Sequence, residues 1–153
     1  VKKMSPAIRR SSAFKIYISN IMTQPGETDN FTVVDHIKEL RKYGGKDIID
    51  CVITNSSDIS DELRDKYLEQ GSELVKTNLK EIKDLGIDCV QEELINISNG
   101  YIKHNSDKLA EVLVDIIMEK KLLYDKKKII EYMYLSQRIR EREKEEKKLK
   151  REK

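Results

Sequence analysis

The sequence is poor in the residues that usually mark catalytic and metal sites. Its 153 residues include only two cysteines, two histidines, two prolines and six glycines, and no tryptophan. Cys51 and Cys89 each lie in an apolar run, which favours buried strand thiols, because a metal site needs closer spacing or histidine partners. The six glycines form no G-x-G-x-x-G pattern, so this common dinucleotide-binding loop is absent from the sequence.

Long apolar runs are also missing, and no segment resembles a signal peptide or a membrane span. The lack of such segments and the low cysteine content together predict a cytoplasmic protein without an integral membrane segment. Charged residues make up 38% of the chain, and residues 138–153 carry nine basic against five acidic ones, so the remainder has a net charge of −2. Such a nearly neutral body predicts no nucleic-acid partner. Opposite charges spaced four apart in the tail favour a solvated helix over a lipid-binding or nucleic-acid-binding one.

Strand and helix patterns alternate along most of the chain. The predicted strands are 14–19, 48–54, 73–76 and 87–90, and the predicted helices are 5–11, 32–43, 61–70, 78–85 and a long one from 105 or 106. The polar stretch 91–100 is predicted to be a loop. The alternation predicts an α/β fold with a mostly parallel sheet layered by helices. Residues 1–120 are assigned to this domain and 121–153 to a charged helical extension.

The segment Asn20–Asp29 is the most informative part of the sequence, because it joins the first predicted strand to the second predicted helix. Open α/β sheets bind ligands at the carboxyl ends of their strands. The segment contains a Pro-Gly pair, typical of a tight turn, and many small hydrogen-bonding side chains. The predicted ligand contacts are Asn20, Thr23, Gln24, Gly26, Glu27, Thr28 and Asp29.

A purely structural interpretation of the same segment also has to be considered. Asp29 or Asn30 immediately precedes the predicted helix, and both residue types are favoured at helix N-caps. In that case the side chain satisfies helix N–H groups and contacts no ligand. The sequence alone does not separate the two roles for any single residue.

The run from Lys15 to Ile37, with its Met-Thr-Gln-Pro-Gly-Glu-Thr-Asp core, resembles the YvcK/CofD-like family of gluconeogenesis factors. Looser resemblances at Ile48–Asn55 and Tyr101–Leu109 extend the match over most of the chain. The resemblance implies a Rossmann-like core whose Gly-rich nucleotide loop and Gly-Pro-Gly loop lie in an amino-terminal half. Neither loop is found here, so the chain is expected to be the carboxyl-terminal half and to bind ligand weakly or not at all by itself.

The same resemblance implies a function. The family binds UDP-sugars such as UDP-N-acetylglucosamine, and is linked to growth on gluconeogenic carbon sources and to cell shape through the supply of wall precursors. It implies Mg²⁺, accompanying the UDP-sugar, as the one cofactor to consider. One alternative is a transferase related to 2-phospho-L-lactate transferase, although no nucleophile–base pair at recognisable spacing supports an enzyme. Another is a truncated remnant or interaction module without its own ligand site, and assembly into a homo-oligomer is left open.

Three further residues join the predicted ligand contacts by resemblance, namely Asn55, Lys103 and His104. Asn55 alternatively shapes the turn after its strand. The family typically has Arg-His-Asp where Lys103 begins a Lys-His-Asn run. Lys103 therefore keeps the positive charge but lacks the two parallel N–H donors of an arginine guanidinium. Asn105 lacks the family's carboxylate and alternatively caps the following helix. His36 is interpreted as a packing histidine.

Overall fold

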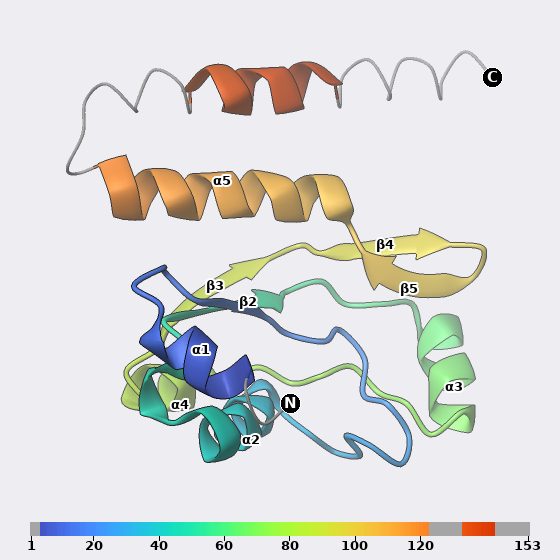
Figure 1. Cartoon of the computed structure of the whole chain (residues 1–153). Helices are drawn as coiled ribbons and strands as arrows, with labels where there is room; N and C mark the ends of the chain where they lie inside the picture. Colours follow the sequence, from blue (N-terminus) through green and yellow to red (C-terminus); the bar gives the residue numbers. More distant parts are fainter. Residues whose placement is uncertain (1–3, 123–132, 143–153) are drawn as a thin grey trace. The chain divides into compact units, whose positions relative to one another are not determined.

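The computed structural model of the chain describes residues 4–122 and 133–142 (Figure 1). The elements are α1 (Met4–Arg10), β1 (Ile16–Ile18), α2 (Val33–Gly44), a 3₁₀ turn (Lys46–Ile48), β2 (Cys51–Asn55), α3 (Asp61–Glu69), α4 (Leu79–Asp84), β3 (Asp88–Glu92), β4 (Ile95–Ser98), β5 (Tyr101–His104) and α5 (Ser106–Leu122). Residues 133–142 are helical as well. Within the described ranges, no helix is long and apolar enough to cross a membrane.

The chain divides into two units, Val1–His104 and Asn105–Lys153. The first contains both sheets, and the second contains α5 with the helical residues 133–142. The predicted long helix after residue 104 is confirmed, and the domain boundary predicted at residue 120 falls inside α5. The predicted charged tail beyond residue 142 lies outside the described residues.

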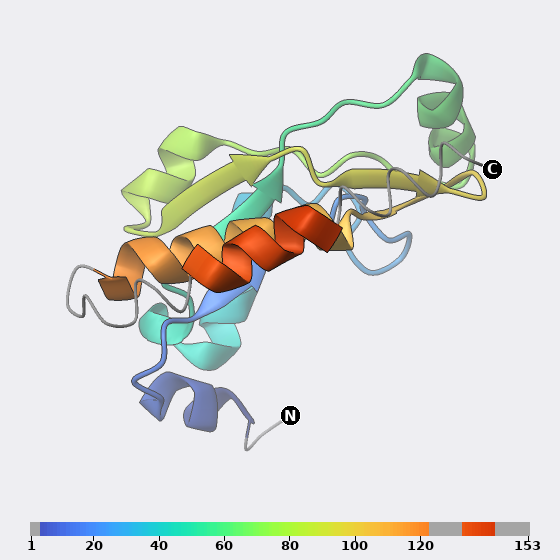
Figure 2. The same cartoon turned by 90° about the horizontal axis from the view of Figure 1, so that it is seen from above.

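The main sheet has three parallel strands in the order β1-β2-β3. Figure 2 shows the strands side by side, with β2 in teal between β1 in blue and β3 in yellow-green. Ile18 is in register with Ile53, and Ile53 with Val90. Val52 and Ile53 of the central strand are fully buried, which explains the continuous apolar run. The predicted α/β class and parallel sheet are confirmed.

The core of the first unit lies between this sheet and α2 and α4, which cover the same face of the sheet (Figure 1). Helix α2 contributes Val33, Val34 and Ile37, and these pack with β2 and α4 through Val52 and Ile82. Cys51 in β2 and Cys89 in β3 form no disulfide; Cys51 is buried and Cys89 is half-buried. The prediction of buried strand thiols is therefore confirmed for Cys51, and Cys89 lies in a strand with partial exposure.

Helix α2 begins with a capping box that fixes where the preceding turn ends. Thr32 is the N-cap, its hydroxyl accepts from the Asp35 N–H at 3.3 Å, and the Asp35 carboxylate accepts from the Thr32 N–H at 2.9 Å. Hydrogen bonds from the Thr32 hydroxyl and then its N–H hold the pKa of Asp35 below its ordinary value. The alternative that Asp29 or Asn30 caps this helix is therefore wrong, and both residues belong to the preceding turn.

The loop predicted at residues 91–100 is wrong, because this stretch contains the end of β3 and all of β4. Strands β4 and β5 form an antiparallel hairpin in which Ile97 faces Ile102. Their connection is Asn99-Gly100, with φ of +53° and +72°, the left-handed pair that a two-residue hairpin turn requires. An Asn-Gly pair between alternating apolar residues is a strong hairpin signal, which the sequence interpretation overlooked.

The hairpin is attached to α3 by two consecutive residues. The Tyr67 hydroxyl accepts a hydrogen bond from the Ile102 N–H at 2.8 Å, and the Lys66 ammonium donates to the Gly100 carbonyl at 2.9 Å. The same ammonium lies 4.9 Å from the centre of the Tyr101 ring, within reach of a cation–π contact. These contacts fix the hairpin against the exposed side of α3.

Candidate functional site

The turn after β1 is held in shape by its own hydrogen bonds. The Glu27 N–H donates to the Gln24 carbonyl at 3.0 Å, and Gly26 between them has φ of +79°, as a type II turn with Pro at its second position requires. The Thr28 N–H donates to the same carbonyl at 2.9 Å, and the Thr28 hydroxyl accepts from the Gln24 N–H at 2.8 Å. Gln24, Gly26, Glu27 and Thr28 thus build the turn, and direct ligand contact by them stays a prediction.

Asp29 is the carboxylate that this turn presents. Its two oxygens accept from the Gly26 N–H at 3.0 and 3.1 Å, and the side chain is exposed. The next residue, Asn30, has φ of +60°, a conformation that asparagine tolerates better than most residues. The turn therefore places a carboxylate and an amide side by side at its end.

Thr23 has a structural role, and direct ligand contact by it stays a prediction. It is 3% exposed, its N–H donates to the Glu73 carbonyl at 2.8 Å, and its hydroxyl accepts from the Glu73 N–H at 2.9 Å. Its carbonyl accepts from the Ser72 hydroxyl at 2.6 Å. The predicted strand at 73–76 exists only as an isolated antiparallel bridge between Met22 and Leu74. Thr23 therefore joins the turn to this extended segment.

Two adjoining cavities lie along the extended segment. The first, of about 370 Å³, is lined by Asp29 and Asn30 of the turn together with Thr23 and residues 71–73. The second, of about 420 Å³, is lined by Ser57, Arg64 and residues 73–76. Leu68 and Glu73 line both cavities, which therefore adjoin each other and are together called here the α3 groove.

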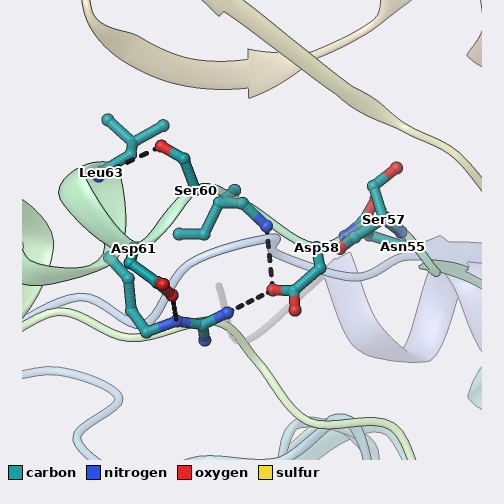
Figure 3. A network of polar contacts seen from close by, with 8 residues as sticks. Asn55, Ser57, Asp58, Ser60, Asp61 and Leu63 are labelled. Atoms are coloured by element: carbon teal, nitrogen blue, oxygen red, sulfur yellow. Dashed lines mark hydrogen bonds and ion pairs between the residues drawn. The ribbon is translucent and has the colours of Figure 1, made fainter.

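Arg64 belongs to a polar network in the loop between β2 and α3 (Figure 3). Its guanidinium donates to the Asp58 carboxylate at 2.5 Å and lies 3.9 Å from the Asp61 carboxylate. The pKa of Asp58 is lowered by a hydrogen bond from the Ile59 N–H and by Arg64. Ser60 caps α3, because its hydroxyl accepts from the Leu63 N–H. The network holds a cation at one end of the α3 groove.

The sequence interpretation missed Arg64 and Ser57 as groove residues. It assigned no ligand role to residues 57–60, although they follow a strand at its carboxyl end, where α/β sheets place ligands. That position was the available signal. No local signal could have shown that residues 73–76 lie beside the turn after β1.

Asn55 shapes the loop that it begins. Its amide NH₂ donates to the Ser57 carbonyl at 2.7 Å, and its amide oxygen accepts from the Ser57 N–H at 3.2 Å and the Leu94 N–H at 3.1 Å. This is the turn-shaping role considered for it above. It is in register with Glu92, and it lines neither cavity of the α3 groove.

His104 lies beside the turn segment, whereas Lys103 does not approach the groove. The His104 Nε2 atom lies 3.1 Å from the Ser19 carbonyl, one residue before Asn20 at the carboxyl end of β1. Lys103 is exposed on the hairpin, opposite Asn96, and lines neither cavity. Of the two predicted residues at the end of β5, only His104 is brought next to the turn segment.

His36 is a packing residue, as the sequence interpretation expected. It is 8% exposed, with ring centres 5.3 Å from Phe31 and 6.3 Å from Tyr17, and its Nε2 atom has no hydrogen-bond partner among the described residues. Burial lowers the pKa of His36 below 6.5, and Asp35 opposes the shift. The folded protein therefore keeps this ring neutral.

We expect this buried ring to make folding stability depend on pH. The unfolded chain protonates His36 near the ordinary pKa of 6.5, whereas the folded chain does so only at lower pH. The stability that the neutral His36 ring contributes to the fold is therefore fully present above pH 6.5 and is lost as the pH falls below it. Urea unfolding at pH 7.5 and 5.5 should show a larger loss in the native protein than in a His36→Phe variant. Equal losses would mean that His36 is not the responsible group.

The groove is not a preformed metal site. Among residues 4–122 and 133–142, no three His, Cys, Asp or Glu side chains gather closely enough to hold a metal ion. Magnesium often keeps several waters and binds through one or two carboxylates plus ligand phosphates. The Mg²⁺ expectation therefore stays a prediction tied to a phosphate-bearing ligand.

A family profile described as 2-phospho-L-lactate transferase CofD matches residues 1–95 of the chain. A Clostridium acetobutylicum protein with a provisional gluconeogenesis-factor name is 48% identical over 147 residues, which cover 96% of this chain and 33% of that protein. The gluconeogenesis factor of Bacillus subtilis is 36% identical over 119 residues, or 78% of this chain and 38% of that protein.

The fold is similar to a crystal structure of a UPF0052 family member from Bacillus halodurans. The two share 32% identity with a TM-score of 0.69, and the match covers 72% of this chain and 36% of that one. The chain thus spans about a third of the length of the relatives that it matches.

Proposed function

This chain belongs to the CofD-like family, among whose members its curated relatives are gluconeogenesis factors, and from that membership we propose that the α3 groove binds a nucleotide sugar of the UDP-N-acetylglucosamine type. One observation supports the proposal most directly. The turn after β1, which resembles the family, and the segment after β2 line adjoining cavities, the turn through Asp29 and the segment through Arg64.

The chemistry of the two cavities suits the sugar and the diphosphate of such a ligand. Their volumes of about 370 and 420 Å³ fall within the range of small-molecule sites. Asp29 and Asn30 offer an acceptor and an amide for sugar hydroxyls. Arg64 offers a cation at the other end, beside the Asp58 carboxylate that orients it, and guanidinium groups suit phosphate oxygens.

A binding role is supported more strongly than a reaction. Neither cavity is lined by a histidine or cysteine, and the one hydroxyl of the turn in the first cavity, that of Thr23, accepts a hydrogen bond from Glu73. We therefore propose a regulatory protein that responds to a nucleotide sugar, with carbon metabolism and wall-precursor supply as its context. Mg²⁺ would accompany the phosphates of the ligand.

A transferase activity is the second candidate, because the matching family profile takes its description from one. The two roles differ in turnover. Incubation with a nucleotide-linked donor and Mg²⁺ should leave the donor unchanged if the protein only binds it, and release of free nucleotide above the rate of a protein-free control would favour the transferase.

The direct test is thermal unfolding of the chain with and without UDP-N-acetylglucosamine, each with and without Mg²⁺. Because the chain spans about a third of its relatives, we expect affinity weaker than micromolar. Ligand at ten times its dissociation constant should add about 1.4 kcal/mol of stability and raise Tm by about 3–6 °C.

N-acetylglucosamine alone serves as the control and should leave Tm unchanged. An unmoved transition at millimolar nucleotide sugar would remove the α3 groove of this chain as a binding site. Micromolar or tighter binding would show that the expected weakness is wrong.

A further inference from the structure

In the extended segment that lines the α3 groove, the backbone groups of Glu73 and Val75 form hydrogen bonds with residues 21–23. The Glu73 carbonyl accepts from the Thr23 N–H, and the Val75 N–H donates to the Ile21 carbonyl at 2.9 Å. Successive residues of an extended chain direct their backbone groups to opposite sides. The N–H and C=O of Leu74 therefore face away from residues 21–23, and neither makes a hydrogen bond within the described residues.

Leu74 lines the larger cavity of the groove, so this unused donor and acceptor lie at a hollow. The apolar side chains of Leu68 and Val75 line the same hollow, and Leu74 is only half-exposed. A backbone N–H and C=O in a partly apolar slot favour a partner that supplies both an acceptor and a donor. Arg64 and Lys76 line the same cavity, and each is ion-paired, Arg64 with Asp58 at 2.5 Å and Lys76 with Glu73 at 3.8 Å.

On that side, Leu74 is the residue of 72–76 that keeps both backbone groups unused among the described residues. The Ser72 N–H donates to the Tyr67 carbonyl at 2.9 Å, and the Lys76 carbonyl accepts from the Val33 N–H at 3.0 Å, so each neighbour has one unused group, the Ser72 C=O and the Lys76 N–H. A peptide that adds a strand to a sheet edge pairs with a row of such groups. One flat heterocycle needs only the donor and the acceptor that Leu74 itself supplies.

We propose that the Leu74 N–H and C=O hydrogen-bond the base of the nucleotide, an inference that rests on the proposed nucleotide-sugar function. The imide edge of uracil presents a carbonyl acceptor next to the N3–H donor, which complements this backbone pair. Leu68 and Val75 contact the ring, Arg64 faces the phosphates, and the sugar occupies the cavity at Asp29. The smaller cavity suits the sugar because a carboxylate and an amide line it.

The test observes the Leu74 amide directly in the ¹⁵N-labelled 153-residue chain by NMR, during titration with UDP-N-acetylglucosamine. We expect the Leu74 amide proton to move downfield together with the signals of Asp29 and Asn30. The analogue methylated at uracil N3 loses the donor, so its dissociation constant should rise about tenfold or more.

The outcomes separate the base contact from the wider proposal. Shifts at Asp29, Asn30 and Arg64 without a Leu74 shift, and equal affinity for the N3-methyl analogue, would overturn the base contact alone. Absence of shifts anywhere at millimolar ligand would overturn the nucleotide-sugar function itself.

A backbone variant gives an independent check. Leu74→Pro removes an N–H that the fold does not use, whereas Leu74→Val keeps it, and thermal unfolding establishes that each variant folds. The proline variant should bind both ligands more weakly than the valine variant, by a similar factor, because the uracil carbonyl loses its donor whereas the C=O of residue 74 still accepts from N3–H. Equal affinities of the two folded variants for UDP-N-acetylglucosamine would contradict the role of the N–H, and the N3-methyl comparison on the native chain still decides if proline prevents folding.

Discussion

Replacing Ile37 by alanine should cost about 2–5 kcal/mol of unfolding free energy, the range for truncating a fully buried aliphatic side chain. Ile37 is 0% exposed and packs in the core that joins α2 to β2 and α4. Small domains have only about 5–15 kcal/mol in total, so the variant should lose a large part of its stability. Urea unfolding followed by circular dichroism measures the change.

Leu40 provides the matched control, because it lies three residues further along the same helix and is 38% exposed. Leu40→Ala should cost clearly less, since little apolar contact is removed and no closed cavity is formed. Similar losses at the two positions would mean that the face of α2 carrying Leu40 is as well packed as the face carrying Ile37.

The second large effect is expected for Asp29→Ala in ligand binding. Asp29 is exposed and lines the smaller cavity, so removal of its carboxylate should weaken UDP-N-acetylglucosamine binding about tenfold to a hundredfold, as expected for loss of a hydrogen bond to a charged group. Its cost to folding should be small, because the carboxylate bonds only the Gly26 N–H at the surface. NMR titration gives the affinity, and Tm gives the stability.

The comparison variant is His36→Ala, which should behave in the opposite way. His36 is buried against Phe31 and lines neither cavity, so its loss should lower Tm and leave the affinity of the folded fraction close to native. Asp29→Asn should fall between native and Asp29→Ala, since it keeps one acceptor oxygen. Negligible effects of both alanine variants on affinity would remove the turn from the site.

Local patterns were enough to find the parallel sheet and the helices around it. The apolar run of β2 predicts a buried strand, which the structure confirms, whereas the cap of α2 by Thr32 and Asp35 was not identified. The hairpin of β4 and β5 was missed because its strands are polar and partly exposed, and their only strong signal is the Asn99-Gly100 turn. Strand patterns are weak where neither face of a strand is buried.

The candidate site could be predicted only where it is continuous in sequence. The turn carrying Asp29 was identified, but the pairing of Thr23 with Glu73 joins segments 50 residues apart and depends on tertiary packing. Arg64 becomes a groove residue only because α3 lies over that paired segment. The free Leu74 edge follows from the same pairing, so no sequence pattern could have shown it.

Helix α3 contacts the β4–β5 hairpin and also lines the α3 groove. Lys66 and Tyr67 hold the hairpin, and Leu68, the next residue, lines both cavities of the α3 groove. Hairpin and groove are therefore not independent targets for selection or engineering. A substitution that tilts this helix and changes the shape of the α3 groove also displaces strands β4 and β5. Substitutions in the hairpin that move α3 change the shape of the groove as well.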